Sequence, residues 1–237
     1  MSYGTLYLIP TPLGEGAPPE AVLPASALAI TRQLQHFVVE HPKTARACLK
    51  LMGTALPLQQ LSMQTLNEHT AAKDVEPLLA PLLAGQDVGL LSEAGCPAVA
   101  DPGAQLVALA HQRQIPVRPL VGPSSLLLAL MASGLNGQRF SFQGYLPAQP
   151  AERQQRLQQL EQHSRRQQET ILFIETPYRN AAMLESLLQT LQSDTRLCVA
   201  TDLTLPSEQV VTRRVADWRS LPRPELNKRP SIFLFLA

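Results

Sequence analysis

The chain has 237 residues, of which 45% are hydrophobic and 16% charged, and 20 Lys and Arg against 19 Asp and Glu give a formal net charge of +1. This composition excludes a wholly disordered protein and is typical of one large globular domain or two small ones. The near-zero net charge gives no bulk electrostatic reason to bind nucleic acid, although RNA is not excluded.

The first half alternates short apolar runs with amphipathic helical patterns, which predicts crossover connections and a mainly parallel sheet. The predicted strands are 5–9, 37–39, 56–61 (weak), 87–91 and 117–120, and the predicted helices are 24–31, 43–52, 74–83 and 102–114. We therefore expect an N-terminal α/β domain over residues 1–120.

A second α/β domain is expected over residues 121–237. Its predicted helices are 126–134, 151–168 and 177–191, and its predicted strands are 139–145, 170–175, 196–203, 207–214 and 231–236. Several late strands follow one another without a helix between them, which indicates antiparallel pairing in a mixed sheet. The helix over 151–168 is rich in Gln and Arg, but its local charge is close to zero, as in an ordinary solvated helix.

The three cysteines are Cys48, Cys96 and Cys198, and they are odd in number and widely spaced. Neither a disulfide framework nor a metal site is predicted from this pattern. The N-terminus lacks the basic start of a signal peptide, and the longest apolar run, Leu126 to Ala132, is too short to cross a bilayer. We expect a cytoplasmic protein with no membrane partner.

The loop 92–103, SEAGCPAVADPG, is the most unusual stretch of the chain. It follows a predicted strand, and it exceeds the usual length of a strand-to-helix loop. Ligands of open α/β sheets bind outside the carboxyl ends of the strands, where small residues let backbone amides approach closely. Within it, Asp101 is interpreted as the N-cap of the following helix, a structural rather than catalytic role.

Other strand-to-helix turns are less specific: PTPLG (10–14), EHPK (40–43), GPSS (122–125) and ETPYRN (175–180). No P-loop, GxGxxG fingerprint or GxSxG elbow is present, so nucleotide hydrolysis, the common dinucleotide site and acyl transfer lose support.

In their order along the chain, PTPLG, SEAGCPAVADPG, GPSS with its helix, and ETPYRN resemble the tetrapyrrole methylase superfamily of S-adenosylmethionine-dependent methyltransferases. Within it, the ribosomal RNA small subunit methyltransferase I branch is the most similar. The resemblance implies two α/β domains with the cofactor in a cleft between them, and a homodimer. That branch usually has EDTR at 40–43 and SDAGTP at 92–97, and usually continues beyond the last strand into a small C-terminal domain.

The resemblance also implies which residues bind S-adenosylmethionine. They are Pro12, Gly14, Ser92, Glu93, Ala94, Gly95, Cys96, Pro97, Ala98, Ser124, Ser125, Thr176, Pro177, Ala200 and Thr201. No metal is expected, because methyl transfer from a sulfonium needs alignment and exclusion of water rather than a nucleophilic side chain.

We expect methylation of a ribose 2′-hydroxyl of ribosomal RNA, for which a general base would help. Glu40 and Glu93 are the two candidates, without a choice between them. Two other functions stay open: a small-molecule methyltransferase of the tetrapyrrole type, and a non-catalytic S-adenosylmethionine-binding or interaction protein.

Overall fold

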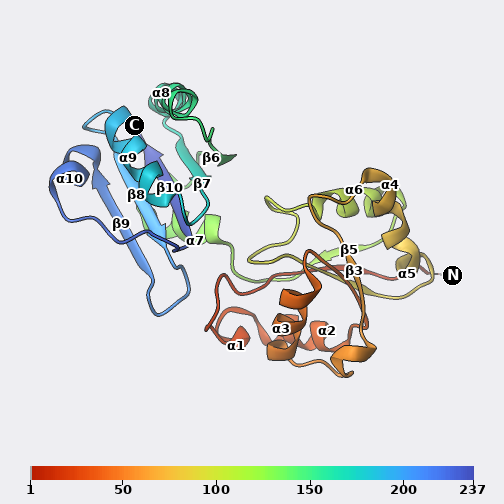
Figure 1. Ribbon diagram of the computed structural model, residues 1–237. Coiled ribbons are helices and arrows are strands. Elements are labelled where there is room, and N and C mark those ends of the chain that lie inside the picture. Colours follow the sequence, from red (N-terminus) through yellow and green to blue (C-terminus); the bar gives the residue numbers. More distant parts are fainter. Residues whose placement is uncertain (1) are drawn as a thin grey trace. The chain divides into compact units, whose positions relative to one another are not determined.

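The computed structural model describes residues 2–237. The chain forms two compact units, of which one ends at Ser124 and the other begins at Ser125 (Figure 1). The boundary predicted after Leu120 is four residues earlier.

The N-terminal unit is built on a five-stranded sheet in which every pairing is parallel. Its strands are β1 (Leu6–Ile9), β2 (His36–Val39), β3 (Ser62–Thr65), β4 (Val88–Leu91) and β5 (Val117–Pro119), in the order β3-β2-β4-β1-β5. The predicted parallel α/β sheet is therefore confirmed.

Helices cover both faces of this sheet (Figure 1). On one face lie α1 (Pro19–Val22), α2 (Ala25–Gln33) and α3 (Pro42–Met52), and on the other lie α4 (Ala72–Val75), α5 (Ala80–Leu83) and α6 (Ala104–Gln112). Accordingly Leu49 packs with Phe37 in one core cluster, while Leu82 and Leu106 pack with Leu90 in another. The connections that leave the neighbouring strands β1 and β4 thus run to opposite faces, which makes a topological switch point.

The C-terminal unit contains a mixed sheet, as predicted. Its strands are β6 (Phe140–Tyr145), β7 (Thr170–Ile174), β8 (Arg196–Thr201), β9 (Gln209–Arg214) and β10 (Ser231–Leu236), in the order β6-β7-β10-β8-β9. Strand β6 is parallel to β7, β10 is antiparallel to β7 and β8, and β8 is antiparallel to β9.

One face of the mixed sheet is covered by α8 (Pro150–Gln167), α9 (Asn180–Thr190) and α10 (Val215–Ser220). Phe173, Phe233 and Trp218 are fully buried there, and the Trp218 indole donates to the carbonyl of Leu197 at 2.9 Å. The other face packs against α7 (Ser125–Ser133), to which Thr212 donates through its hydroxyl.

Three local predictions were wrong. The segment 56–61 is not a strand: it contains the short 3₁₀ helix η1 (Leu58–Gln60), and β3 follows it. The helix predicted over 74–83 is broken into α4, the 3₁₀ helix η2 (Glu76–Leu79) and α5, because Pro77 and Pro81 interrupt the backbone hydrogen bonds. The N-cap of α6 is Gly103 rather than Asp101, so that helix begins later than predicted.

Candidate functional site

The loops after β1 and β4 are joined at the carboxyl edge of the parallel sheet. Thr11 donates its N–H to the carbonyl of Gly95 at 2.9 Å, and Gly95 returns a bond to the carbonyl of Thr11 at 3.1 Å. This bridge lies at the switch point, where the two loops separate toward opposite faces. In open α/β sheets, a crevice at such a switch point, outside the carboxyl ends of the strands, is where ligands bind.

Glycine is required at two points of this crevice. Gly95 has a φ of +75°, and a Cβ there would lie 3.2 Å from a methyl group of Leu13. A Cβ on Gly122, in the loop after β5, would lie 2.3 Å from the Cβ of Pro10. The loops after β1, β4 and β5 therefore approach more closely than side chains would allow.

Side chains of the loop after β4 hold its own backbone in place. Ser92 lies within 3.4 Å of the Gly95 carbonyl through its hydroxyl, and the Cys96 thiol donates to the carbonyl of Pro123 at 3.4 Å. Burial raises the pKa of Cys96, so this thiol stays protonated at neutral pH and acts as a donor rather than a nucleophile.

Asp101 organises the second half of this loop. Its Oδ1 accepts the N–H of Ala98 at 3.1 Å and that of Gly103 at 2.8 Å. Ala98 and Ala100 have φ values of +65° and +56°, which cost energy in residues with a Cβ. The Asp101 carboxylate therefore stabilises a strained backbone, a structural role of the kind expected, although it is not the predicted cap.

We expect Asp101→Ala to lower the free energy of unfolding by about 1–3 kcal/mol, because it leaves two N–H groups without their charged acceptor. Asp101→Asn keeps an acceptor oxygen and should lose less. Chemical denaturation of the three proteins measures the difference, and equal stability of the alanine variant and the wild type would contradict the assigned role.

Two acidic side chains meet at the rim of the crevice. Glu40 follows β2 and Glu93 follows the adjacent strand β4, so the two carboxyl groups are close enough to interact electrostatically. Burial raises the pKa of Glu40, and the charges of Asp101 and Glu93 raise it further. A carboxyl with a raised pKa is suited to proton transfer near neutral pH.

The carboxylate of Glu93 is held by the first turn of α3. Thr44 donates its hydroxyl to Glu93 Oε1 at 2.5 Å, and the Nδ1 of His41 lies 3.9 Å from the same oxygen. Sequence reasoning missed Thr44, because its contact with Glu93 joins residues far apart in the chain. Of the two carboxylates, Glu93 is thus the more constrained by other side chains.

Other predicted residues of this unit are spread along the same loops. Pro12 and Gly14 lie in the segment after β1, with Ala94 and Pro97 in the segment after β4. Ser124 is the last residue of the N-terminal unit and Ser125 is the first of α7, so the hydroxyl pair spans the unit boundary.

In the C-terminal unit, the predicted residues lie at one end of the mixed sheet. Thr176 and Pro177 follow β7, whereas Ala200 and Thr201 end β8, and β10 lies between these two strands. The hydroxyl of Thr201 lies 3.2 Å from that of Ser231 on β10. These residues are therefore separated by about two strand spacings, roughly 10 Å.

Beside Thr176, a buried carboxylate is only half satisfied. Glu175 is 5% exposed, and its Oε1 accepts the Thr176 N–H at 2.7 Å and the Arg179 guanidinium at 2.6 Å. Its Oε2 is buried and has no hydrogen-bond partner among residues 2–237. Such an acceptor requires a donor from outside the described chain.

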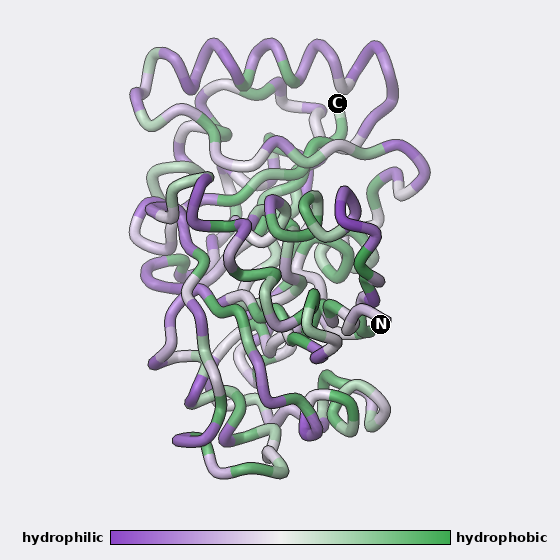
Figure 2. The backbone as a smooth tube through the Cα atoms, turned by 90° about the vertical axis from the view of Figure 1, so that its right-hand side faces the viewer, coloured by the Kyte–Doolittle hydropathy of each residue, from purple (hydrophilic) through white to green (hydrophobic). Residues whose placement is uncertain are grey.

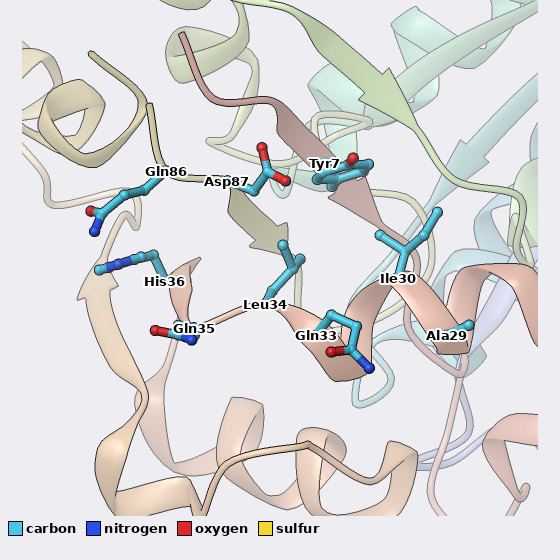
Figure 3. Close-up of a pocket in the computed structure, with 9 residues that line it drawn as sticks. All are labelled: Tyr7, Ala29, Ile30, Gln33, Leu34, Gln35, His36, Gln86 and Asp87. Carbon is cyan, nitrogen blue, oxygen red and sulfur yellow. The ribbon is translucent and has the colours of Figure 1, made fainter. Parts of the chain in front are cut away.

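A pocket of about 530 Å³ lies elsewhere, at the amino ends of β2 and β4 (Figure 3). Its lining includes Tyr7, Leu34, His36, Gln86 and Asp87. Because the strand-end loops emerge from the opposite edge of the sheet, this pocket is not part of the crevice.

Two further observations concern metals and membranes. The described part of the chain contains no group of three or more His, Cys, Asp or Glu side chains that could hold a metal ion. In the same residues, every helix is too short or too polar to span a bilayer.

A parallel sheet with a switch point, whose strand-end loops are joined by the Thr11–Gly95 bridge, and a mixed sheet that follows in the chain define an α/β protein of two units. The model of the family described as tetrapyrrole (corrin/porphyrin) methylases matches residues 6–218. The chain belongs to this family and is a methyltransferase, as predicted from its motifs.

Curated relatives agree with this assignment. The ribosomal RNA small subunit methyltransferase I of Xylella fastidiosa is 34% identical over 99% of this chain and 81% of its own length. The protein of the same name from Synechocystis is 36% identical over 87% of this chain and 69% of its own length.

Solved structures support the fold. The methyltransferase CobJ has a TM-score of 0.63 and 18% identity, covering 100% of this chain and 94% of its own. The cobalt precorrin-4 methyltransferase CbiF has a TM-score of 0.61 and 16% identity, covering 98% and 94%. At these identities the likeness concerns the fold alone.

Proposed function

We propose that this protein uses S-adenosylmethionine to methylate RNA of the small ribosomal subunit at a ribose 2′-hydroxyl. The observation that carries the proposal is the crevice around the Thr11–Gly95 bridge, with Glu40 and Glu93 at its rim. The curated relatives, whose names specify ribosomal RNA of the small subunit, support the substrate.

The residues of the N-terminal unit fit a sulfonium amino acid. A Cβ on Gly95 would lie 3.2 Å from a methyl group of Leu13, so only glycine leaves this stretch of backbone uncovered by its own side chain. The neighbouring residues from Ser92 to Ala98 would bind through main-chain groups. The protonated thiol of Cys96 is not positioned as a competing nucleophile, because it is committed to the carbonyl of Pro123.

The C-terminal unit offers acceptors for a nucleoside. The unpartnered Oε2 of Glu175 would accept a hydroxyl or amino group of the ligand, which accounts for a buried oxygen that the described chain leaves unsatisfied. Thr176, Pro177, Ala200 and Thr201 would line the same end of the sheet. We also propose that Ser124 and Ser125, the hydroxyl pair of the GPSS motif, take part in cofactor binding.

Bound S-adenosylmethionine supplies an electrophilic methyl group together with its own leaving group. The residues of the chain then need to orient the acceptor hydroxyl, exclude water and accept one proton. We assign the proton to Glu40, since its raised pKa gives it the stronger basicity. Glu93, fixed by Thr44 and His41, would orient the acceptor.

The test is transfer of a tritiated methyl group from S-adenosylmethionine to small ribosomal subunits. Ribose 2′-O-methylation blocks alkaline cleavage of the following phosphodiester, so the label should remain in an alkali-resistant dinucleotide. Label released as a single nucleotide would reject the ribose assignment. Label in a tetrapyrrole substrate alone, or cofactor binding without turnover, would instead support the small-molecule or the non-catalytic alternative.

We further propose that the protein acts in the cytoplasm as a homodimer. Both follow from the assigned substrate and family rather than from a contact within this chain. Sedimentation equilibrium of the purified protein tests the dimer.

A further inference from the structure

Two arginines lie directly opposite each other at one end of the mixed sheet. Arg196 at the start of β8 pairs in register with Arg214 at the end of β9, so both side chains project from the same face. Like charges in this position destabilise a sheet. Both residues are exposed, and within residues 2–237 neither guanidinium has a hydrogen bond or an ion pair.

Three more arginines gather at the same end of the unit. Arg165 and Arg166 lie in the last turn of α8, and Arg139, just before β6, donates to the carbonyl of Gln167 at 2.9 Å. All three are exposed. We call Arg139, Arg165, Arg166, Arg196 and Arg214 the arginine cluster.

The charge of the arginine cluster is mostly uncompensated. Arg165 contacts both carboxylate oxygens of Asp194 at 3.1 Å, and in the described chain no other carboxylate forms an ion pair with a member of the cluster. Arg214 also lowers the pKa of Asp194, after the larger effect of Arg165. Because the whole chain carries only +1, the cluster is a local concentration of charge rather than a result of composition.

An exposed aromatic ring lies in the same row of the sheet as Arg196 and Arg214, with the buried Thr170 and Leu236 between it and Arg196. Phe140, at the start of the edge strand β6, pairs with Thr170 and is 44% exposed. Thr170 lies beside Leu236 of β10, because the next pair along these two strands is Ile171 with Phe235. Leu236 in turn pairs with Arg196, and Arg196 pairs with Arg214. Phe140 and Arg214 are therefore the two ends of one row across the five strands. Four strand spacings make that row roughly 19 Å long.

Helix α8, the mostly purple helix at the top of Figure 2, is hydrophilic along most of its length. Arg196 and Arg214 project from the face that packs against α7, whereas α8 with Arg165 and Arg166 covers the other face, so the cluster surrounds one end of the sheet. Guanidinium groups gathered in this way, with an exposed aromatic ring next to one of them, are typical of a surface that binds single-stranded nucleic acid. Arginines neutralise successive phosphates, and a ring stacks on an unpaired base.

We propose that the arginine cluster and Phe140 form an RNA-binding surface that holds an unpaired segment of the ribosomal RNA substrate. This inference rests on the proposed function and adds where the C-terminal unit contacts RNA. A second copy of the chain fits this surface poorly, because a two-fold interface would bring arginines against arginines.

The test uses the full chain, a labelled small-subunit RNA fragment and the double variant Arg196→Glu/Arg214→Glu. We expect RNA affinity to fall at least tenfold, and the slope of log affinity against log salt to decrease by about 1.4, or roughly 0.7 for each lost phosphate contact. Arg196→Gln/Arg214→Gln should show the same slope change with a smaller loss of affinity. Cofactor binding and thermal unfolding check that both variants are folded.

The matched control is Lys73→Glu/Arg118→Glu, which makes the same change in charge at two exposed residues of the N-terminal unit. It should retain wild-type RNA affinity. Wild-type affinity and salt dependence in the Arg196/Arg214 variants would overturn the inference, and so would a change in their oligomeric state without a change in RNA binding. Failure of the wild type to transfer a methyl group to RNA would contradict the proposed function, and this result is distinct from a loss of RNA binding in the variants.

Discussion

Gly95→Trp should abolish binding of S-adenosylmethionine in titration calorimetry. Gly95 forms the Thr11 bridge with a φ of +75°, and even a Cβ would lie 3.2 Å from Leu13. An indole at this position would fill the space between the loops after β1 and β4. Affinity equal to that of the wild type would reject the position of the site.

A matched control is needed, because any side chain is strained at a positive φ. Gly134, at the end of α7, has a φ of +67°, and a Cβ there meets nothing within 4 Å. Gly134→Trp should therefore carry a similar backbone cost but keep cofactor affinity. Gly95→Ala should give an intermediate loss, which separates crevice filling from global unfolding.

Glu40→Gln should lower the rate constant of methyl transfer by about 10²–10⁴-fold, the usual contribution of a general base. Cofactor affinity should change little, since glutamine preserves the size of the side chain. Glu93→Gln serves as the comparison, and we expect a smaller decrease because Glu93 is assigned to orientation. An equal or larger effect of Glu93→Gln would exchange the two roles.

The pH dependence gives a second measurement on the same residue. A general base is active when deprotonated, so the rate should rise with pH through the raised pKa of Glu40 and then level off. In Glu40→Gln this limb of the profile should disappear. A profile that is unchanged apart from its height would assign the ionisation to another group.

The free energy of unfolding should decrease over the same pH range in which the rate of methyl transfer increases. Because the pKa of Glu40 is higher in the folded state than its ordinary value of 4.5, the folded state binds the proton more tightly. Stability is therefore lost as pH rises from the ordinary value through the raised one. Glu40→Gln should then be at least as stable as the wild type at pH 7, as measured by urea denaturation.

The sequence allowed the fold class to be predicted because the periodicity of each element is local. A strand was predicted over residues 87–91, and the structure contains β4 over Val88–Leu91, all four of which are buried. Gly134 was expected to end a helix, and α7 ends at Ser133 with Gly134 at a positive φ. Periodicity alone did not show where Pro77 and Pro81 break a helical pattern into separate turns.

Strand order and the detailed contacts of the site are non-local, so they could not be predicted in the same way. The bridge between Thr11 and Gly95 joins residues far apart in the chain. The loop 92–103 was expected to lie at a strand end, but the electrostatic interaction between Glu40 and Glu93 requires β2 and β4 to be neighbours. Which strands become adjacent depends on how the helices pack against the sheet.

The position of β10 has a consequence for biosynthesis. This strand, Ser231–Leu236, lies between β7 and β8 and is buried along its whole length. Nascent chains emerge from the ribosome in order, so the mixed sheet cannot close until these six residues are available. The N-terminal unit has all five of its strands by Pro119 and is free to fold while the residues of the C-terminal unit are still being synthesised.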